Sequence, residues 1–365
     1  MNELKVNARA GTPLYVSVKE AVRGAIERGR YQPGQQLPST KALSDQLEVS
    51  LVTVHRAMQE LVATGVLRRG QGKGTFVHEE YVKRSAKTHG MRVGLVFHQE
   101  SSLADSYHGL IMEGVRRQAD ELGIDLVLLR FGEDWRNECQ GYLYVNPFPD
   151  QLERPIRFAK TTKAPNDGLP IIVVGAKSAR QGVAAVDADN VEIGRSAVTH
   201  LVQHGHRRLG FVGGIGSVSN DADRWAGFVE GCQKHGVEIV KSAVIREASW
   251  RLDPTGVVAL AGVMKSAERP TAIFAAGYYF ALNVYEAART AGLNIPGELS
   301  VVGVDDPPSA GLLSPPLTTF SQPLVKIGRM AVVELADLVV KGERAPQQVT
   351  LSAEMVVRGS VALVG

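Results

Sequence analysis

The chain has 365 residues, too many for one ordinary domain of roughly 100–200 residues, so we expect two or three packed cores. Hydrophobic residues make up 44% and charged residues 22% of the sequence, a balance that excludes wholesale disorder. A net charge of +3 over this length does not by itself indicate a polyanionic partner, so charge is considered segment by segment.

Signals for secretion, membrane insertion and cross-linking are missing from the sequence. No stretch approaches the ~20 apolar residues that cross a bilayer, and the first residues lack an apolar signal core. Cys139 and Cys232 have neither CxxC nor Cys/His ligand spacing, so we expect no disulfide framework and no metal site. We therefore expect a cytoplasmic protein with no membrane partner.

Residues 12 to 78 are predicted to form three short helices followed by a hairpin. Apolar residues recur at helical spacing from Leu14 to Ile26, and this first helix is expected to run to about Arg28. Ser39 and Ser50 are the predicted N-caps of the second and third helices. Strand patterns at 66–69 and 75–77 then flank a glycine loop. Together these elements predict a helix-turn-helix with a wing.

The third helix is predicted to have one buried and one exposed face. The buried stripe comprises Val54, Ala57, Met58 and Leu61. The exposed residues are Leu51, Val52, Thr53, His55, Arg56 and Gln59. A second helix of this kind enters the major groove, where polar side chains reach base edges and the capped helix end meets a phosphate. Charge alone would equally fit a solvated face of a small helical domain.

The motifs LYxxV, YxPGxxLPS, VSxxTVxRAMxEL and GxGTFV follow one another between Pro13 and Val77. In this order and spacing they resemble the winged-helix domain of GntR-family regulators. The helix geometry and the resemblance together imply DNA contacts from Lys41, Ser50, Thr53, His55, Arg56, Gln71, Gly72 and Lys73. The sequence departs from the family at Leu51 and His55, where arginine is common, and at Val52, where threonine is common. Each lost arginine removes a possible guanine contact worth roughly 1–3 kcal/mol.

The hydrophobic pattern of the sequence changes after a polar segment, 79–90, which we interpret as a linker. From Met91 short apolar runs alternate with amphipathic helical stretches, a pattern typical of parallel sheets with helices on both faces. The runs are 93–97, 126–129, 141–145, 171–174, 209–212, 273–275 and 301–304. These strands would overload one small sheet, so we expect two α/β subdomains with a ligand site at the carboxyl ends of their strands.

Three segments of this second part, 186–214, 301–332 and 351–360, resemble the effector domain of the LacI family, which has the fold of periplasmic sugar-binding proteins. The combination with a GntR-type domain is similar to arabinose-type repressors. The resemblance implies a DNA-binding domain at 1–78, a linker at 79–90 and an effector-binding and dimerisation domain at 91–365. The first subdomain is expected at about 91–177 and 321–350, the second at about 178–320 and 351–365.

Sugar recognition needs polar groups that pair with adjacent hydroxyls and an aromatic face that covers the ring. By resemblance, the ligand-binding arginine and aspartate are Arg224 and Asp305, and the stacking aromatic is Trp250. The other candidates are Asn146, Tyr107 or His108, and Tyr278. A tryptophan is more often a core residue, and Arg224 could be an ordinary helix surface residue.

Two departures from the LacI pattern affect the expected effector site. Gly277 and Tyr278 replace the usual Asn-Asp pair, so Tyr278 or Tyr279 could stack on a ligand instead. The crossover at 131–140 is shorter than the dozen residues that a parallel connection normally takes, which predicts a lost or reduced helix. Both changes favour an unusual effector or none.

The sequence thus predicts an α/β protein with an N-terminal winged helix-turn-helix and a two-subdomain, periplasmic-binding-protein-like effector domain. We expect a ligand-responsive repressor of carbohydrate genes that binds a palindromic double-stranded DNA operator as a homodimer. Its effector is expected to be a small polar molecule, a sugar or sugar derivative. A regulator with a silent pocket and a solute-binding module are the alternatives. Neither a cofactor nor an enzymatic activity is expected, because no GK[ST], GxSxG or HExxH motif occurs.

Overall fold

The computed structural model describes residues 6, 13–70, 74–79, 81, 88, 90–98, 106–133, 139–153, 156–158, 161–163, 169–178, 183–214, 218–341 and 348–364. The chain divides into two compact units, Met1–Met91 with Leu122–Ile124, and the remainder. None of the described helices is long and apolar enough to span a membrane.

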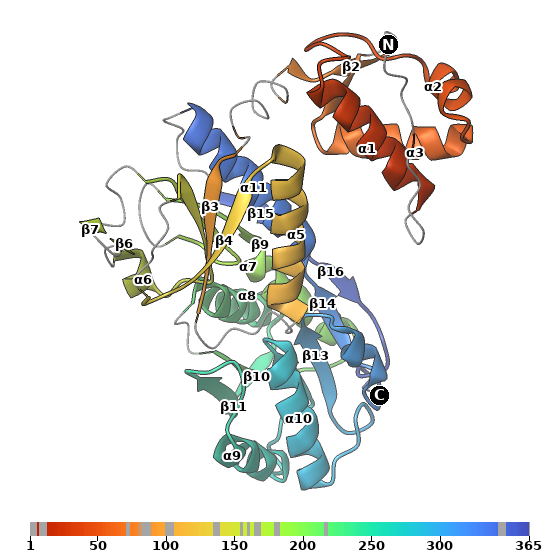
Figure 1. Ribbon diagram of the computed structural model, residues 1–365. Coiled ribbons are helices and arrows are strands. Elements are labelled where there is room, and N and C mark those ends of the chain that lie inside the picture. The colour runs from red at the N-terminus through yellow and green to blue at the C-terminus, as the bar shows by residue number, and fades with distance from the viewer. Residues whose placement is uncertain are drawn as a thin grey trace. The chain divides into compact units, whose positions relative to one another are not determined.

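The first unit contains the predicted helices and hairpin (Figure 1). They are α1 (Leu14–Glu27), α2 (Thr40–Leu47), α3 (Leu51–Ala63), β1 (Leu67–Gly70) and β2 (Gly74–Val77). Both predicted caps are confirmed, because Ser39 Oγ accepts a hydrogen bond from Ala42 N at 3.1 Å and Ser50 Oγ accepts one from Thr53 N at 3.2 Å. Such bonds satisfy backbone amides that the first turn of a helix leaves without partners.

The hairpin is held to the helices by the chain that precedes α2. Gly34 N donates to Val77 O, Val77 N donates to Gln35 O, and Leu37 N donates to Thr75 O. The buried face of α3 is the predicted one. Within the predicted linker, Tyr81 is only 2% exposed and its hydroxyl donates to Glu27 Oε1 at 2.9 Å. A single aromatic residue gives no periodicity, so the sequence did not indicate this anchor.

The second unit is built on two six-stranded sheets (Figure 1). The first sheet has the order β15 (Gln348–Leu351), β9 (Ala184–Ala188), β8 (Ile171–Val174), β5 (Gly141–Val145), β3 (Arg92–Phe97) and β4 (Asp125–Arg130), all parallel. The second has the order β11 (Glu238–Glu247), β10 (Arg208–Gly214), β12 (Ala272–Ala275), β13 (Ser300–Val304), β14 (Thr318–Ser321) and β16 (Glu354–Val356). Only β16 runs antiparallel to its neighbour in that sheet. All seven predicted strands are therefore confirmed.

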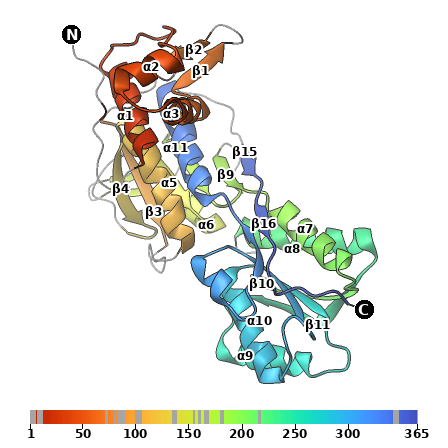
Figure 2. The same cartoon turned by 90° about the vertical axis from the view of Figure 1, so that its right-hand side faces the viewer.

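Helices cover both faces of the second sheet, as predicted, with α9 and α10 on one side and α7 and α8 on the other (Figure 2). The helices of this unit are α5 (Ser106–Leu122), α6 (Pro149–Glu153), α7 (Asn190–Gln203), α8 (Ser219–His235), α9 (Pro254–Met264), α10 (Tyr278–Ala291), α11 (Leu324–Lys341) and the 3-10 helix η1 (Pro308–Leu312). A separate hairpin joins β6 (Ile156–Phe158) to β7 (Thr161–Lys163).

One part of the expected subdomain division is wrong. The expected second subdomain begins at about 178, but β9 pairs with β8 and β15 in the first sheet. The chain passes from the first sheet to the second only after Ala188, where β9 ends. The pairing of β9 determines this boundary, and the sequence motif that begins at 186 does not mark it. In the short crossover at 131–140, residues 134–138 lie outside the described residues, and the described flanks are not helical.

His206, which precedes β10, is a buried histidine with a testable effect on stability. It is 3% exposed, and its Nδ1 lies 3.0 Å from Thr271 Oγ1. Burial, aided by the charges of His204 and His200, lowers the pKa of His206 to about 4 from 6.5. Between these values the unfolded chain binds a proton that the folded chain does not. The contribution of His206 to the free energy of unfolding is therefore largest above pH 6.5, and it decreases as the pH falls toward 4.

We expect the free energy of unfolding to drop by up to ~1.4 kcal/mol per pH unit between pH 6.5 and 4 because of this one group. Thermal midpoints measured from pH 7.5 to 5 for wild type and His206→Asn test the assignment. Asparagine keeps a polar atom near Thr271 but does not titrate, so the variant should lose less stability in acid. An identical acid response in both proteins would exclude His206 as the responsible group.

Candidate DNA interface and effector site

Two of the predicted DNA-contacting residues, Ser50 and Thr53, lie at the start of α3. Ser50 Oγ and Thr53 Oγ1 lie 2.8 Å apart, so the two hydroxyls are hydrogen-bonded to each other at the helix end. His55 on α3 and Lys41 on α2 are exposed. Arg68 and Arg69 on β1 are exposed as well. The predicted contacts Gln71, Gly72 and Lys73 lie outside the described residues.

Arg56 has an intramolecular role that the sequence did not indicate. Its guanidinium carbon lies 3.9 Å from the centroid of the Tyr15 ring on α1, a cation–π arrangement. Its Nε is also 3.9 Å from Glu60 Oε1, and Lys19 Nζ of α1 lies 3.0 Å from Glu60 Oε2. With its side chain 62% exposed, Arg56 can still meet a phosphate. It also braces α3 against α1.

Arg224 is a buried arginine in α8, and hydrogen bonds fix its direction. It is 5% exposed, its Nε donates to Asn190 Oδ1 at 2.8 Å, and its Nη1 donates to Ala276 O at 2.9 Å. Asn190 begins α7 directly after the first sheet, whereas Ala276 follows β12 of the second sheet. Arg224 therefore ties the segment leaving the first sheet to the carboxyl edge of the second, and it is not a helix surface residue.

Asp187 extends this chain of hydrogen bonds at the end of β9. It is 2% exposed, and it accepts bonds from Ala188 N at 2.7 Å and from Asn190 Nδ2 at 2.9 Å. Burial raises the pKa of Asp187 to about 7, although the Ala188 amide and Arg224 act in the opposite direction. A buried carboxyl group with a pKa near neutrality beside an arginine is characteristic of functional sites.

Two further predicted residues, Asn146 and Tyr107, contact each other beside the first sheet. Asn146 follows β5 and is 3% exposed, and the Tyr107 hydroxyl in α5 lies 3.4 Å from Asn146 Oδ1. Burial raises the pKa of Tyr107 above its ordinary range. The negative charges of Asp187 and Asp305 raise this pKa further, whereas Asn146 and Arg224 lower it. The Tyr107 hydroxyl also lies 3.5 Å from Gly175 O at the end of β8, and this carbonyl accepts from Asn220 Nδ2 of α8 at 3.3 Å, so Tyr107 is connected to the helix that carries Arg224.

Asp305 and Asp306 at the end of β13 have different partners. Asp305 Oδ1 accepts from Gln322 Nε2 at 2.6 Å, whereas Asp306 pairs with Arg358 at 2.8 Å. Asp305 has a φ of 72°, a left-handed conformation that is uncommon outside glycine, although aspartate and asparagine adopt it more often than other residues. Such backbone outliers concentrate at ligand sites.

Comparison with known proteins finds a family match in each of the two units. Residues 14–77 match the model for bacterial regulatory proteins of the GntR family, and residues 198–361 match the model for the periplasmic binding protein-like domain. The chain joins a GntR-type DNA-binding domain to a periplasmic-binding-protein-like domain. The latter match covers most of the second sheet and its helices, including Arg224 and Asp305.

The similar proteins are transcriptional regulators. The arabinose metabolism transcriptional repressor of Geobacillus stearothermophilus is 26% identical over 345 residues, which cover 90% of this chain and 91% of the repressor. The transcriptional repressor PurR of Shigella dysenteriae is 27% identical over 299 residues, covering 77% of this chain and 83% of PurR. A solved complex of the transcriptional regulator CelR with cellobiose aligns with 89% of this chain and 100% of its own, with a TM-score of 0.62 and 24% identity. The structural likeness shows a shared fold.

The aromatic residues predicted to stack on the ligand are more exposed than Arg224 and Asn146. Trp250, after β11, is 47% exposed, so it is not a core residue, and no ring contact joins it to the other described aromatics. The Tyr278 hydroxyl donates to Ser309 Oγ at 2.7 Å, which ties the first turn of α10 to η1. Tyr279 is 43% exposed. Trp250 and Tyr279 are thus exposed, whereas Arg224 and Asn146 are buried and Asp305 and Tyr107 are half-buried.

Several functional candidates were missed by sequence reasoning. Asp221 in α8 is 6% exposed, and burial raises its pKa while Arg224 and Arg246 oppose the shift. Asn220 Nδ2 donates to Gly175 O at 3.3 Å, which connects α8 with the end of β8. The only sequence signal was a run of polar residues after an apolar strand. The burial of these groups depends on the other sheet.

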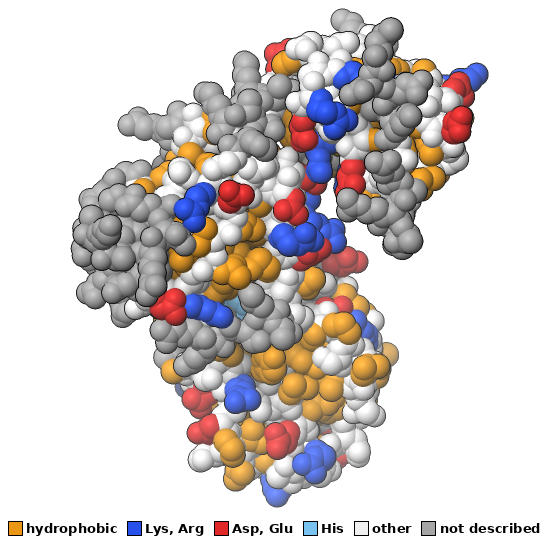
Figure 3. Space-filling view, viewed as in Figure 1, with side chains coloured by type: hydrophobic (Ala, Val, Ile, Leu, Met, Phe, Trp, Pro, Cys, Tyr) orange, Lys and Arg blue, Asp and Glu red, His pale blue; other side chains and the backbone are white. Residues whose placement is uncertain are grey.

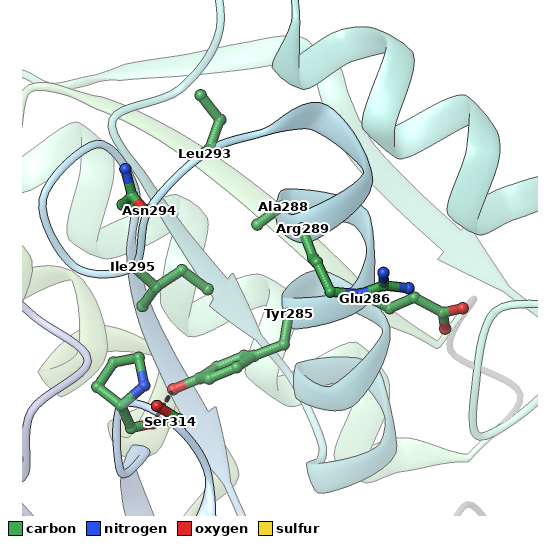
Figure 4. Close-up of a pocket in the computed structure, with 9 residues that line it drawn as sticks. Tyr285, Glu286, Ala288, Arg289, Leu293, Asn294, Ile295 and Ser314 are labelled. Carbon is green, nitrogen blue, oxygen red and sulfur yellow. Dashed lines mark hydrogen bonds between the residues drawn. The ribbon is translucent and has the colours of Figure 1, made fainter.

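A pocket of about 540 Å³ lies elsewhere in the same domain (Figure 4). Its lining includes Tyr285 and Arg289 of α10, Ile295 and Pro315. This is the C-terminal end of α10, whereas Tyr278 and the Arg224 group lie at the N-terminal end. Ligands of parallel α/β sheets bind at the carboxyl ends of the strands. The candidate effector site is therefore the set of residues at those ends, namely Arg224, Asp305, Asn146 and Tyr107.

Proposed function

We propose that the protein is a ligand-responsive transcriptional repressor whose GntR-type domain binds a palindromic operator and whose second domain binds a small effector. The main support is that one chain contains both domains and is similar to an arabinose metabolism repressor over 90% of its length. A repressor acts on chromosomal DNA, so we place its action in the cytoplasm. The GntR-type domain favours this function over a solute-binding module.

The effector we propose is a sugar or sugar derivative held by Arg224, Asp305, Asn146 and Tyr107. Guanidinium, carboxylate and amide groups match the paired donors and acceptors of adjacent hydroxyls. Trp250 and Tyr278 supply aromatic faces for the apolar side of a ring. Two similar proteins, an arabinose metabolism repressor and a regulator solved in complex with cellobiose, support this class. An effector must bind the two conformations unequally to change operator affinity.

We also propose that the protein acts as a homodimer, because a palindromic operator presents two equal half-sites. Apolar side chains gather over and beside α10 on one face of the second domain (Figure 3). Tyr279 in α10 is 43% exposed and Leu312 in η1 is 84% exposed, and the Tyr278 to Ser309 hydrogen bond makes these two elements neighbours. A contiguous apolar surface of this kind favours contact with a second copy.

The double variant Lys41→Ala/His55→Ala tests the DNA-binding function. Loss of one base contact and one phosphate contact should weaken binding to a duplex selected from random sequence by tenfold or more, at roughly 1–3 kcal/mol for the base contact. The variant should also show a smaller dependence of affinity on salt. Lys241→Ala, an exposed lysine on β11, is the control and should bind as wild type does. Unchanged affinity in the double variant would argue against DNA recognition by α3.

A further inference from the structure

Two aliphatic side chains are exposed in the first turn of α3. Leu51 is 51% exposed and Val52 is 78% exposed, directly after the Ser50 cap. Four apolar residues further along this helix, Val54, Ala57, Met58 and Leu61, are buried. Exposed aliphatic groups are hydrated at a cost in free energy, which a binding partner can remove. The domain therefore presents apolar atoms where its recognition helix begins.

The surroundings of these side chains favour nucleic acid over a protein partner. Polar residues, Ser50 and His55, flank them and are exposed, so the apolar area is small for a protein interface. Arg68 and Arg69 on β1 add positive charge to the same domain. The N-terminal residues of the second helix in a helix-turn-helix meet base edges in the major groove.

Thymine is the base that fits such side chains. In the major groove only thymine carries an apolar group, its 5-methyl, and aliphatic side chains make contact with it. Neither leucine nor valine can donate or accept a hydrogen bond from its side chain, so neither can select guanine as an arginine would. We propose that Leu51 and Val52 read thymine 5-methyl groups in each operator half-site. This inference rests on the proposed DNA-binding function and specifies how that function selects sequence.

Deoxyuridine substitution in the bound duplex tests the proposal directly. The full-length chain selects its preferred duplex from a random library, and each thymine is then replaced singly by deoxyuridine, which removes only the methyl group. We expect a loss of affinity of about fourfold at one or two thymines per half-site, the effect of one buried methyl group. The remaining thymines should tolerate the change.

Side-chain variants assign each methyl group to its reader. Leu51→Ala and Val52→Ala should each abolish the deoxyuridine penalty at one position and leave the other position unchanged. Leu14→Ala is the matched control, because Leu14 is 41% exposed in the same domain but begins α1. It should retain every penalty. Thermal unfolding of the variants shows whether they fold. The deoxyuridine series with the wild-type protein tests thymine reading even if a variant does not fold.

The outcomes separate this inference from the proposed function. Specific binding with every deoxyuridine duplex within twofold of the parent would overturn thymine reading and leave the regulator assignment in place. A penalty that persists in both alanine variants would overturn the assignment to Leu51 and Val52. Failure of the full-length chain to enrich or bind any duplex would contradict the proposed function as well.

Discussion

Replacing Arg224 with alanine is expected to reduce effector affinity by a factor of about 30 or more while leaving operator binding intact. The substitution removes a buried charge and leaves Asn190 Oδ1 and Ala276 O without their hydrogen-bond donor. Truncating one partner of a buried charged hydrogen-bond network costs about 2–5 kcal/mol. The same loss leaves the Asp187 carboxyl without a nearby positive charge, so the unliganded variant should also melt at a lower temperature.

A thermal-shift screen of monosaccharides, sugar acids, sugar phosphates and nucleobases identifies the ligand class, followed by titration calorimetry with the best compound. Arg195→Ala is the matched control, because Arg195 pairs with Glu230 on the helix surface. It should bind the compound as wild type does. An equal ligand-induced shift in Arg224→Ala would show that the ligand binds elsewhere, with the pocket beside Tyr285 as the next place to test.

Gly227→Ala is expected to destabilise the periplasmic-binding-protein-like domain strongly. A methyl group on Gly227 of α8 would overlap the carbonyl oxygen of Val191 on α7, and one on Gly194 of α7 would overlap the carbonyl oxygen of Arg224. The two helices therefore touch backbone to backbone, and they can accept a larger residue only by moving apart. Overpacking costs typically 1–3 kcal/mol, and more where backbone atoms must move.

Gly262→Ala in α9 is the control, since a methyl group there meets nothing within 4 Å. Alanine in an exposed helix interior should raise stability by roughly 0.5–1 kcal/mol. Thermal midpoints should thus fall for Gly227→Ala and rise slightly for Gly262→Ala. Effector affinity should fall only in Gly227→Ala, because separating α7 from α8 lengthens the Asn190 to Arg224 hydrogen bond. A similar midpoint in both variants would contradict the close helix contact.

The sequence predicted features that depend on neighbouring residues. Ser39 and Ser50 cap their helices because the bond runs to an amide three residues ahead. Buried parallel strands were found because both faces are apolar, as in β5 and β8. The edge strand β11 alternates buried and exposed positions less regularly, and the short strand β15 is largely exposed, so neither produced a recognisable run.

The candidate site was predicted only in part, for a similar reason. Arg224 and Asp305 lie in recognisable sequence motifs. Asp187 belongs to the site because it accepts a hydrogen bond from Asn190, which in turn accepts one from Arg224, 34 residues further along the chain. The stacking of Arg56 on Tyr15 likewise joins separate helices. Nothing in the local sequence marks Gly227 as a backbone contact of Val191. Contacts of this kind require the fold.

Coupling between the two domains is the central claim, and fluorescence anisotropy of a labelled duplex measures it directly. The full-length protein is titrated into the selected duplex with and without a saturating concentration of the compound from the thermal-shift screen. We predict that the dissociation constant for the duplex changes by roughly 5- to 150-fold, the usual range of allosteric coupling, and that Arg224→Ala loses this response. An unchanged dissociation constant for wild type at saturating compound would contradict the account.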